Sequence, residues 1–133
     1  MKFKYVLVVM IVTLAMSSCK KKKDTMQANV SAVTISVLSP VEGHIYSSGD
    51  TVYVKASIGY AGMLHGYEIR VTDTATDAVL FDVAEHSHSD SFVVDDYFVV
   101  SGTEEIVLLL DVRAEVEHGG EIAERQLYCV FRP

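Results

Sequence analysis

The feature that most constrains the fold of this chain is a repeated two-residue alternation of apolar and polar side chains. No stretch after residue 30 has a helical period of any length, whereas period-two segments recur between turn residues. The pattern predicts strands at 33–37, 51–58, 66–72, 78–84, 90–95, 104–116 and 121–131. We expect the glycine-containing segment 59–62 to end the second of these strands and to separate it from the third.

Seven short strands in about 100 residues, without a helix, predict an all-β fold, an antiparallel β-sandwich, with an open barrel as the alternative. The turn chemistry adds a resemblance. The segment Leu38-Ser39-Pro40-Val41-Glu42-Gly43, followed by Ser48-Gly49-Asp50-Thr51-Val52, is similar to the start of immunoglobulin-like modules of secreted bacterial proteins. That resemblance implies an immunoglobulin-like sandwich.

The segment 104–116 is the longest predicted strand, and its first half is apolar on both faces, which indicates a central position in a sheet. We expect one face of the last strand to pack on it through Leu127, Cys129 and Phe131, opposite Leu108, Leu110 and Val112. Cys129 is therefore interpreted as a buried, inert thiol. A reactive or intermolecular thiol is the alternative.

The N-terminal residues have the pattern of a secretion signal. Lys2 and Lys4 precede an apolar run over 5–16 that is too short to cross a bilayer, which takes about 20 residues. The run closes on Met16-Ser17-Ser18-Cys19, which resembles the lipobox of bacterial lipoproteins. The resemblance implies cleavage of residues 1–18 and attachment of membrane lipid to Cys19. An ordinary cleaved signal with a chance cysteine is the alternative.

We expect the lipidated cysteine and a flexible tether to occupy residues 19–32 and a single domain to occupy 33–133. Lys20 to Lys23 would lie against anionic head groups. From residue 30 onward, five Lys and Arg face seventeen Asp and Glu, a net charge of −12. Such a domain repels nucleic acid and favours cationic partners or metal ions.

With its anchor, the whole chain resembles the small single-domain lipoproteins of Bacteroidetes-type bacteria, most of which have no assigned activity. The resemblance implies a place in the bacterial cell envelope. Lys20 directly follows the cysteine, and the lysine run lacks the acidic residues of surface-export signals. We therefore expect an outer-membrane protein that faces the periplasm, with surface exposure as the alternative.

Four of the five histidines should gather at one end of the sandwich. His65 lies in the connection after the second predicted strand, His86 and His88 follow the fourth, and His118 lies in the turn before the last. In an immunoglobulin-like arrangement these three connections meet at one pole. His44, which precedes the second strand, belongs at the other pole.

Imidazole is the commonest metal ligand, and three or four neutral nitrogens suit Zn²⁺ or Cu²⁺. The sequence therefore predicts a zinc or copper site formed by His65, His86, His88 and His118. Glu85, Asp90 and Glu117 could supply a carboxylate, and Gly62, Gly66, Gly119 and Gly120 would let the loops approach closely. Solvated or structural histidines are the alternative. A weaker alternative is Ca²⁺ at Asp73, Asp77, Asp95 and Asp96.

Two functions follow from these patterns. The first is a membrane-tethered binding module that holds a metal ion at the histidine pole. The second is a non-catalytic accessory lipoprotein that docks on an envelope protein assembly, for which Tyr46, Tyr53, Tyr60, Tyr67 and Tyr97 could supply contacts. The sequence has no Gly-x-Ser-x-Gly, phosphate loop or His-Glu-x-x-His motif, so we do not expect an enzyme.

Overall fold

The computed structural model describes residues 30–116 and 120–133, and this part of the chain is almost entirely β-structure. One 3-10 turn, η1 (Val30–Ala32), precedes the strands. The strands are β1 (Thr34–Ser39), β2 (Ile45–Ser47), β3 (Thr51–Asp73), β4 (Val79–Glu85), β5 (Ser89–Val99), β6 (Ile106–Val116) and β7 (Glu121–Arg132). No helix among these residues is long and apolar enough to cross a membrane.

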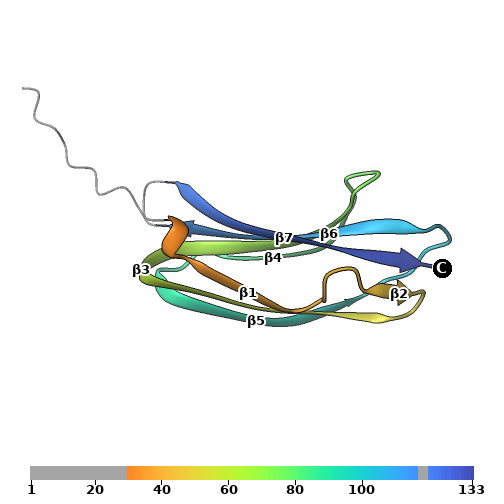
Figure 1. Cartoon of the computed structure of the whole chain (residues 1–133), viewed down its shortest axis with the longest axis horizontal. Helices are drawn as coiled ribbons and strands as arrows, with labels where there is room; N and C mark the ends of the chain where they lie inside the picture. Colours follow the sequence, from red (N-terminus) through yellow and green to blue (C-terminus); the bar gives the residue numbers. More distant parts are fainter. Residues whose placement is uncertain (1–29, 117–119) are drawn as a thin grey trace, which may run out of the picture.

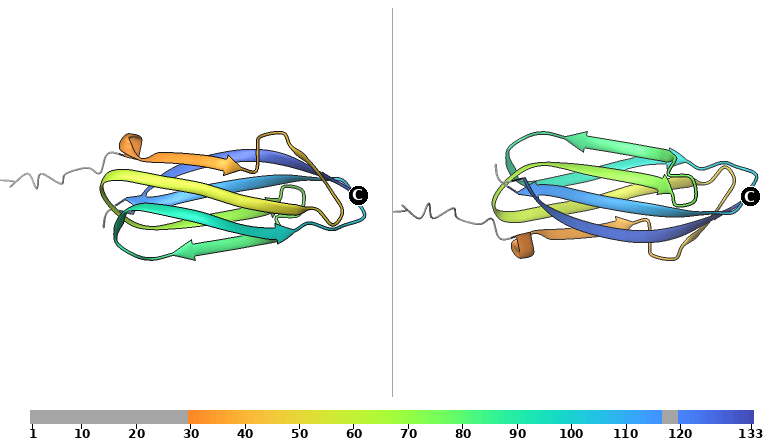
Figure 2. Two further views of the ribbon diagram at one scale, coloured as in Figure 1. Left: turned by 90° about the horizontal axis from the view of Figure 1, so that it is seen from below. Right: turned by 90° about the horizontal axis from the view of Figure 1, so that it is seen from above.

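The seven strands form one sheet that folds over into two layers (Figure 1). The first layer contains β1, the first part of β3, and β5. The second contains β4, the last part of β3, β6 and β7, with β2 added in parallel beside the end of β7. Figure 2 presents the two layers from opposite sides. The all-β, seven-stranded fold predicted from the sequence is confirmed, and its two layers are compatible with the predicted sandwich, although the sheet is continuous and curled like a half-barrel.

The continuity comes from β3, where the prediction of a break at 59–62 was wrong. Residues 51–59 pair with β1 and β5, residues 64–73 pair with β4 and β6, and the intervening residues keep a strand conformation as they cross between layers. Gly59 and Gly62 therefore do not end the strand. At Gly62 a Cβ would lie 2.6 Å from the Tyr60 ring, so glycine relieves crowding where the strand bends, and the chain turns without a loop.

The core lies between the layers and follows the alternation read from the sequence. From Leu108 to Val116, every second residue of β6 is at most 2% exposed, and β6 lies between β3 and β7 as predicted for a central strand. Leu127, Cys129 and Phe131 are also buried. The prediction that these three face the core is confirmed. Burial, followed by the charge of Glu42, raises the pKa of the Cys129 thiol to about 11, so the thiol stays protonated at neutral pH.

The fifth predicted strand, 90–95, was too short, because β5 runs from Ser89 to Val99. It pairs with β3 along the whole stretch from Thr51 to Gly59. The backbone of β5 stays paired with β3 at Asp95 and Asp96, although the side-chain pattern of the sequence suggested that the strand ends there. Lys55 of β3 makes an ion pair with Asp95 at 3.1 Å, so that acidic residue is compatible with the sheet.

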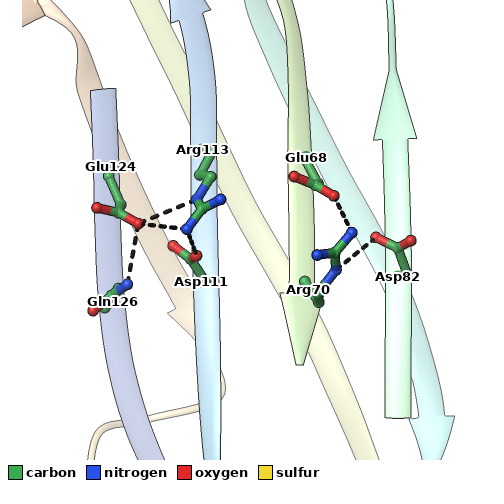
Figure 3. A network of polar contacts seen from close by, with 7 residues as sticks. All are labelled: Glu68, Arg70, Asp82, Asp111, Arg113, Glu124 and Gln126. Atoms are coloured by element: carbon green, nitrogen blue, oxygen red, sulfur yellow. Dashed lines mark hydrogen bonds and ion pairs between the residues drawn. The ribbon is translucent and has the colours of Figure 1, made fainter. Parts of the chain in front are cut away.

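The outer face of the second layer is covered by ion pairs between neighbouring strands (Figure 3). Arg113 of β6 contacts Asp111 at 2.8 Å and Glu124 of β7 at 3.1 Å, while Arg70 of β3 contacts Glu68 and lies 3.7 Å from Asp82 of β4. These pairs are partly exposed, so each contributes little to stability. As a result, the guanidinium group of each arginine is paired with carboxylates on the same face of the sheet.

Candidate functional site

Three of the four histidines predicted to converge do so at one end of the molecule, which we call the histidine pole. His65 lies on β3 where the strand enters the second layer, and His86 and His88 lie in the link between β4 and β5. The link is brought there because the end of β4 pairs with Tyr67, while Ser89, at the start of β5, pairs with Leu64. His118 lies outside the described residues.

His65, His86 and His88 form a compact group, called the histidine cluster below. The ring centroid of His65 is 4.3 Å from that of His86 and 4.4 Å from that of His88, and the latter two centroids are 6.3 Å apart. All three pairs meet edge to face. The side chain of His65 is 20% exposed, whereas His86 and His88 are exposed residues of the link. The cluster therefore has one anchored ring and two that face solvent.

A β-bulge positions His65. Leu64 pairs with Val116 and Gly66 pairs with Glu115, so β3 carries one residue more than β6 at this point, and that residue is His65. A bulge re-aims a side chain and changes which face the following residues present. Accordingly, the buried positions of β3 are even-numbered up to Leu64 and odd-numbered from Ile69.

Gly66 makes the bulge sterically feasible. Its φ is +152°, and a Cβ at this position would collide with the backbone oxygen of Glu85 and approach the Cα of His86 within 3.2 Å. Only glycine combines this backbone conformation with so close an approach. Of the four glycines proposed to let the loops come together, Gly66 is the one that places β3 directly against the segment carrying His86.

A carboxylate that sequence reasoning did not name lies beside the cluster. Oε2 of Glu115, on β6, is 3.6 Å from Nδ1 of His65. A carboxylate in this place can fix the orientation and tautomer of an imidazole, as it does for many metal-bound histidines. The change from even to odd apolar positions across Gly66 is a sequence signal of the bulge, but the approach of Glu115 to His65 follows only from the strand register, in which Glu115 pairs with Gly66.

The carboxylates that were named have other environments. Glu85 accepts a hydrogen bond from the Ser87 hydroxyl at 2.7 Å, which ties the link together beside His86. Asp90 accepts one from the Ser91 hydroxyl at 3.0 Å. Glu117 lies outside the described residues. Glu115, the carboxylate 3.6 Å from the His65 ring, was not among those that the sequence suggested.

His44 lies at the opposite end, as predicted. Its backbone oxygen accepts a hydrogen bond from the backbone N–H of Val130 on β7. Nine residues earlier on β7, Glu121 pairs with Val116 at the histidine pole. At about 3.4 Å per residue this separation is roughly 30 Å. The His44 ring packs edge to face on Tyr46, with centroids 4.5 Å apart.

The donor atoms of the cluster are close but not preset for a metal. Within 30–116 and 120–133, no three His, Cys, Asp or Glu side chains are arranged as they stand to hold an ion. The four aspartates of the calcium alternative fall in two places. Asp73 and Asp77 lie in the β3–β4 turn, where Asp73 accepts hydrogen bonds from Ala75 and Thr76, while Asp95 and Asp96 lie within β5. These hydrogen bonds lower the pKa of Asp73.

The chain has no match among protein-family models or curated proteins.

Proposed function

We propose that this chain is a lipid-anchored module of the bacterial cell envelope whose β-sandwich binds a transition metal ion, Zn²⁺ or Cu²⁺, through the histidine cluster. One observation carries the proposal: three imidazoles from two separate segments lie with their ring centroids 4.3–6.3 Å apart. The envelope location and the lipid anchor are proposed from residues 1–19 of the sequence.

The spacing of the rings fits one shared ion. When imidazoles bind a tetrahedral Zn²⁺ at about 2.0–2.1 Å, their ring centroids lie roughly 5 Å from one another. The distances in the cluster bracket that value. Rotation of the exposed His86 and His88 side chains would replace the edge-to-face contacts with nitrogens directed at one point, while Glu115 holds His65 in place.

The charge of the domain supports a cation at the pole. The net charge of −12 from residue 30 onward raises the local concentration of divalent ions, and Glu85 and Glu115 lie beside the cluster. The thiol of Cys129 is buried in the core on β7 and is not part of the cluster. A donor set of imidazoles and carboxylates suits Zn²⁺ or Cu²⁺ better than the soft Cu⁺ ion.

The test is the melting temperature of the purified chain with and without Zn²⁺ or Cu²⁺. An ion that binds only the folded state stabilises it by mass action, so the melting temperature should rise with metal concentration. The rise should fade below about pH 6, because protonated imidazole cannot coordinate a metal.

The variant carrying both His86→Ala and His88→Ala should lose this rise, while His44→Ala, at the other end of the molecule, should keep it. An equal metal response in the two variants would eliminate the site. Elemental content after purification from a metal-supplemented culture gives a second, independent readout.

An accessory docking function has one observation in its favour. The outer face of the first layer exposes Val93, Tyr97 and Val99 of β5 beside Tyr53 of β3, with Val93 81% exposed. The rings of Tyr53 and Tyr97 lie 6.3 Å apart. Tyrosine is enriched at protein interfaces, and the neighbouring valines extend the apolar surface of this face. If this face docks on an envelope protein, exchanging Val93 and Tyr97 for lysine should abolish cross-linking to that partner while leaving the metal response intact.

A further inference from the structure

A hollow of about 380 Å³ opens directly beside the histidine cluster, on the outer face of the second layer. It exists because Gly66 of β3 and Ala84 of β4 present small side chains in a face otherwise covered by long ones. His86 belongs both to the cluster and to the lining of the hollow, and Glu115, which contacts His65, lines it as well. An ion held by the cluster would therefore lie at the edge of this hollow.

The lining of the hollow has an apolar and a charged component. Ala84 and Ile122 provide apolar surface, whereas Glu68, Glu85 and Glu115 provide three carboxylates. The volume is that of a small-molecule site, in which apolar walls hold the body of a ligand and a few polar groups orient it.

The charged groups of the lining leave an excess of negative charge. The guanidinium of Arg113 contacts Asp111 at 2.8 Å and Glu124 at 3.1 Å, two carboxylates that do not line the hollow (Figure 3). Glu68 is paired with Arg70. Glu85 and Glu115 are therefore the carboxylates that give the hollow its negative charge.

We propose that the hollow seats a small basic nitrogen ligand, an imidazole or amine that also carries a positive charge, whose donor nitrogen binds the metal ion of the histidine cluster. This inference rests on the proposed metal site. Within the described residues the cluster supplies three imidazoles, and three protein ligands with an exogenous fourth is a common arrangement for Zn²⁺. The carboxylates favour a cationic ligand and oppose an anionic one of the same shape.

The experiment compares two ligands with the same donor and opposite charge. The chain is loaded with Cu²⁺, and the dissociation constants of 1-(3-aminopropyl)imidazole and 3-(imidazol-1-yl)propanoic acid are measured from the visible absorption of the copper. The cationic ligand should bind at least about tenfold more tightly. Equal affinity, or a preference for the anionic ligand, would overturn the inference.

A matched pair of variants localises the effect. Ala84→Phe fills the hollow from an exposed position of β4, and Val93→Phe places the same side chain on β5, on the other layer. Ala84→Phe should weaken binding of the cationic ligand about tenfold and leave the Cu²⁺ affinity unchanged, while Val93→Phe should alter neither. Identical behaviour of the two variants would place the ligand outside the hollow.

The outcomes separate the two proposals. If the parent chain fails to bind Cu²⁺, the metal site is wrong and the ligand site falls with it. If Cu²⁺ binds and is lost in the variant with His86→Ala and His88→Ala, but neither charge of the ligand is preferred, the metal site stands and the hollow has no role.

Discussion

At the scale of single residues, the histidine pole depends on the pair His65 and Gly66. The bulge gives His65 a position of its own opposite β6, and the positive φ of Gly66 lets the end of β4 approach. A residue with a Cβ at position 66 would have to displace the backbone of Glu85 and, with it, the link that carries His86. One backbone position thus controls both the fold at the bend and the geometry of the cluster.

Gly66→Ala should lower the free energy of unfolding by about 2–4 kcal/mol, because it combines an unfavourable φ with a backbone collision. Chemical denaturation measures the loss. Gly59→Ala is the matched control on the same strand, since a Cβ there meets nothing within 4 Å, and it should change stability by less than about 1 kcal/mol. Equal costs for the two substitutions would contradict the role assigned to Gly66.

The buried thiol of Cys129 should make stability depend on alkaline pH. Its pKa in the folded chain is about 11, above the 9.0 of an unperturbed thiol, so the folded state holds the proton more tightly. The resulting stabilisation is complete below pH 9 and is lost as the pH rises toward 11, by about 2 kcal/mol.

Cys129→Ala removes this dependence and serves as the reference. The difference in unfolding free energy between parent and variant should shrink by about 2 kcal/mol between pH 9 and pH 11. Tyr67, whose pKa is also raised by burial, is present in both proteins and cancels. The pKa of Tyr46 is raised by burial and by the charge of Cys129, so the difference also contains the coupling between these two groups. A difference that stays constant across this range would show that the thiol is not desolvated.

At the scale of elements, β3 organises the molecule, because this 23-residue strand belongs to both layers. Leu64 marks the crossing: it pairs with Ser89 of β5 on one side and with Val116 of β6 on the other, and it is fully buried. The alternation of apolar residues predicted both halves of β3. It did not predict their continuity, because a bend and a loop have the same local signature of small residues.

Leu64→Ala should cost about 2–5 kcal/mol, since it removes side-chain volume where the two layers join and leaves a cavity. Met63→Ala, the adjacent and 53% exposed position, should cost less than about 1 kcal/mol. Thermal unfolding of the two variants measures the contrast. Similar losses would mean that the crossing segment is not packed against the core.

At the scale of the whole molecule, the histidine pole and the start of the described chain lie at the same end (Figure 1). Thr34 of β1 pairs with Gly59, next to the bend of β3, and Val30 lies close to Ile122 at the start of β7. Ten residues lie between Cys19 and Val30, so even a fully extended chain reaches only about 40 Å. If Cys19 carries lipid, the tether joins the domain at the end that carries the histidine cluster.

Lipidation itself is the prediction at this scale. Membrane-bound protein should begin at residue 19 and carry added acyl mass by mass spectrometry. Cys19→Ala should move the domain into the soluble fraction, because several acyl chains are needed for stable anchoring and this variant has none. Cys129→Ala, which also removes one sulfur, should stay with the membrane. An unmodified chain with a different N-terminus would exclude the anchor.

The sequence by itself determined the all-β class, the strand-forming segments other than the short β2, and the inward faces of β6 and β7, because strand periodicity is a local property that burial enforces. It also predicted that His65, His86, His88 and His118 would meet at one end; the first three do, and His118 lies outside the described residues. The partnership of Glu115 with His65, the bulge, the continuous β3 and the hollow beside His86 were decided by the tertiary structure. They depend on the approach of Gly66 to Glu85, a contact between segments that local patterns do not encode.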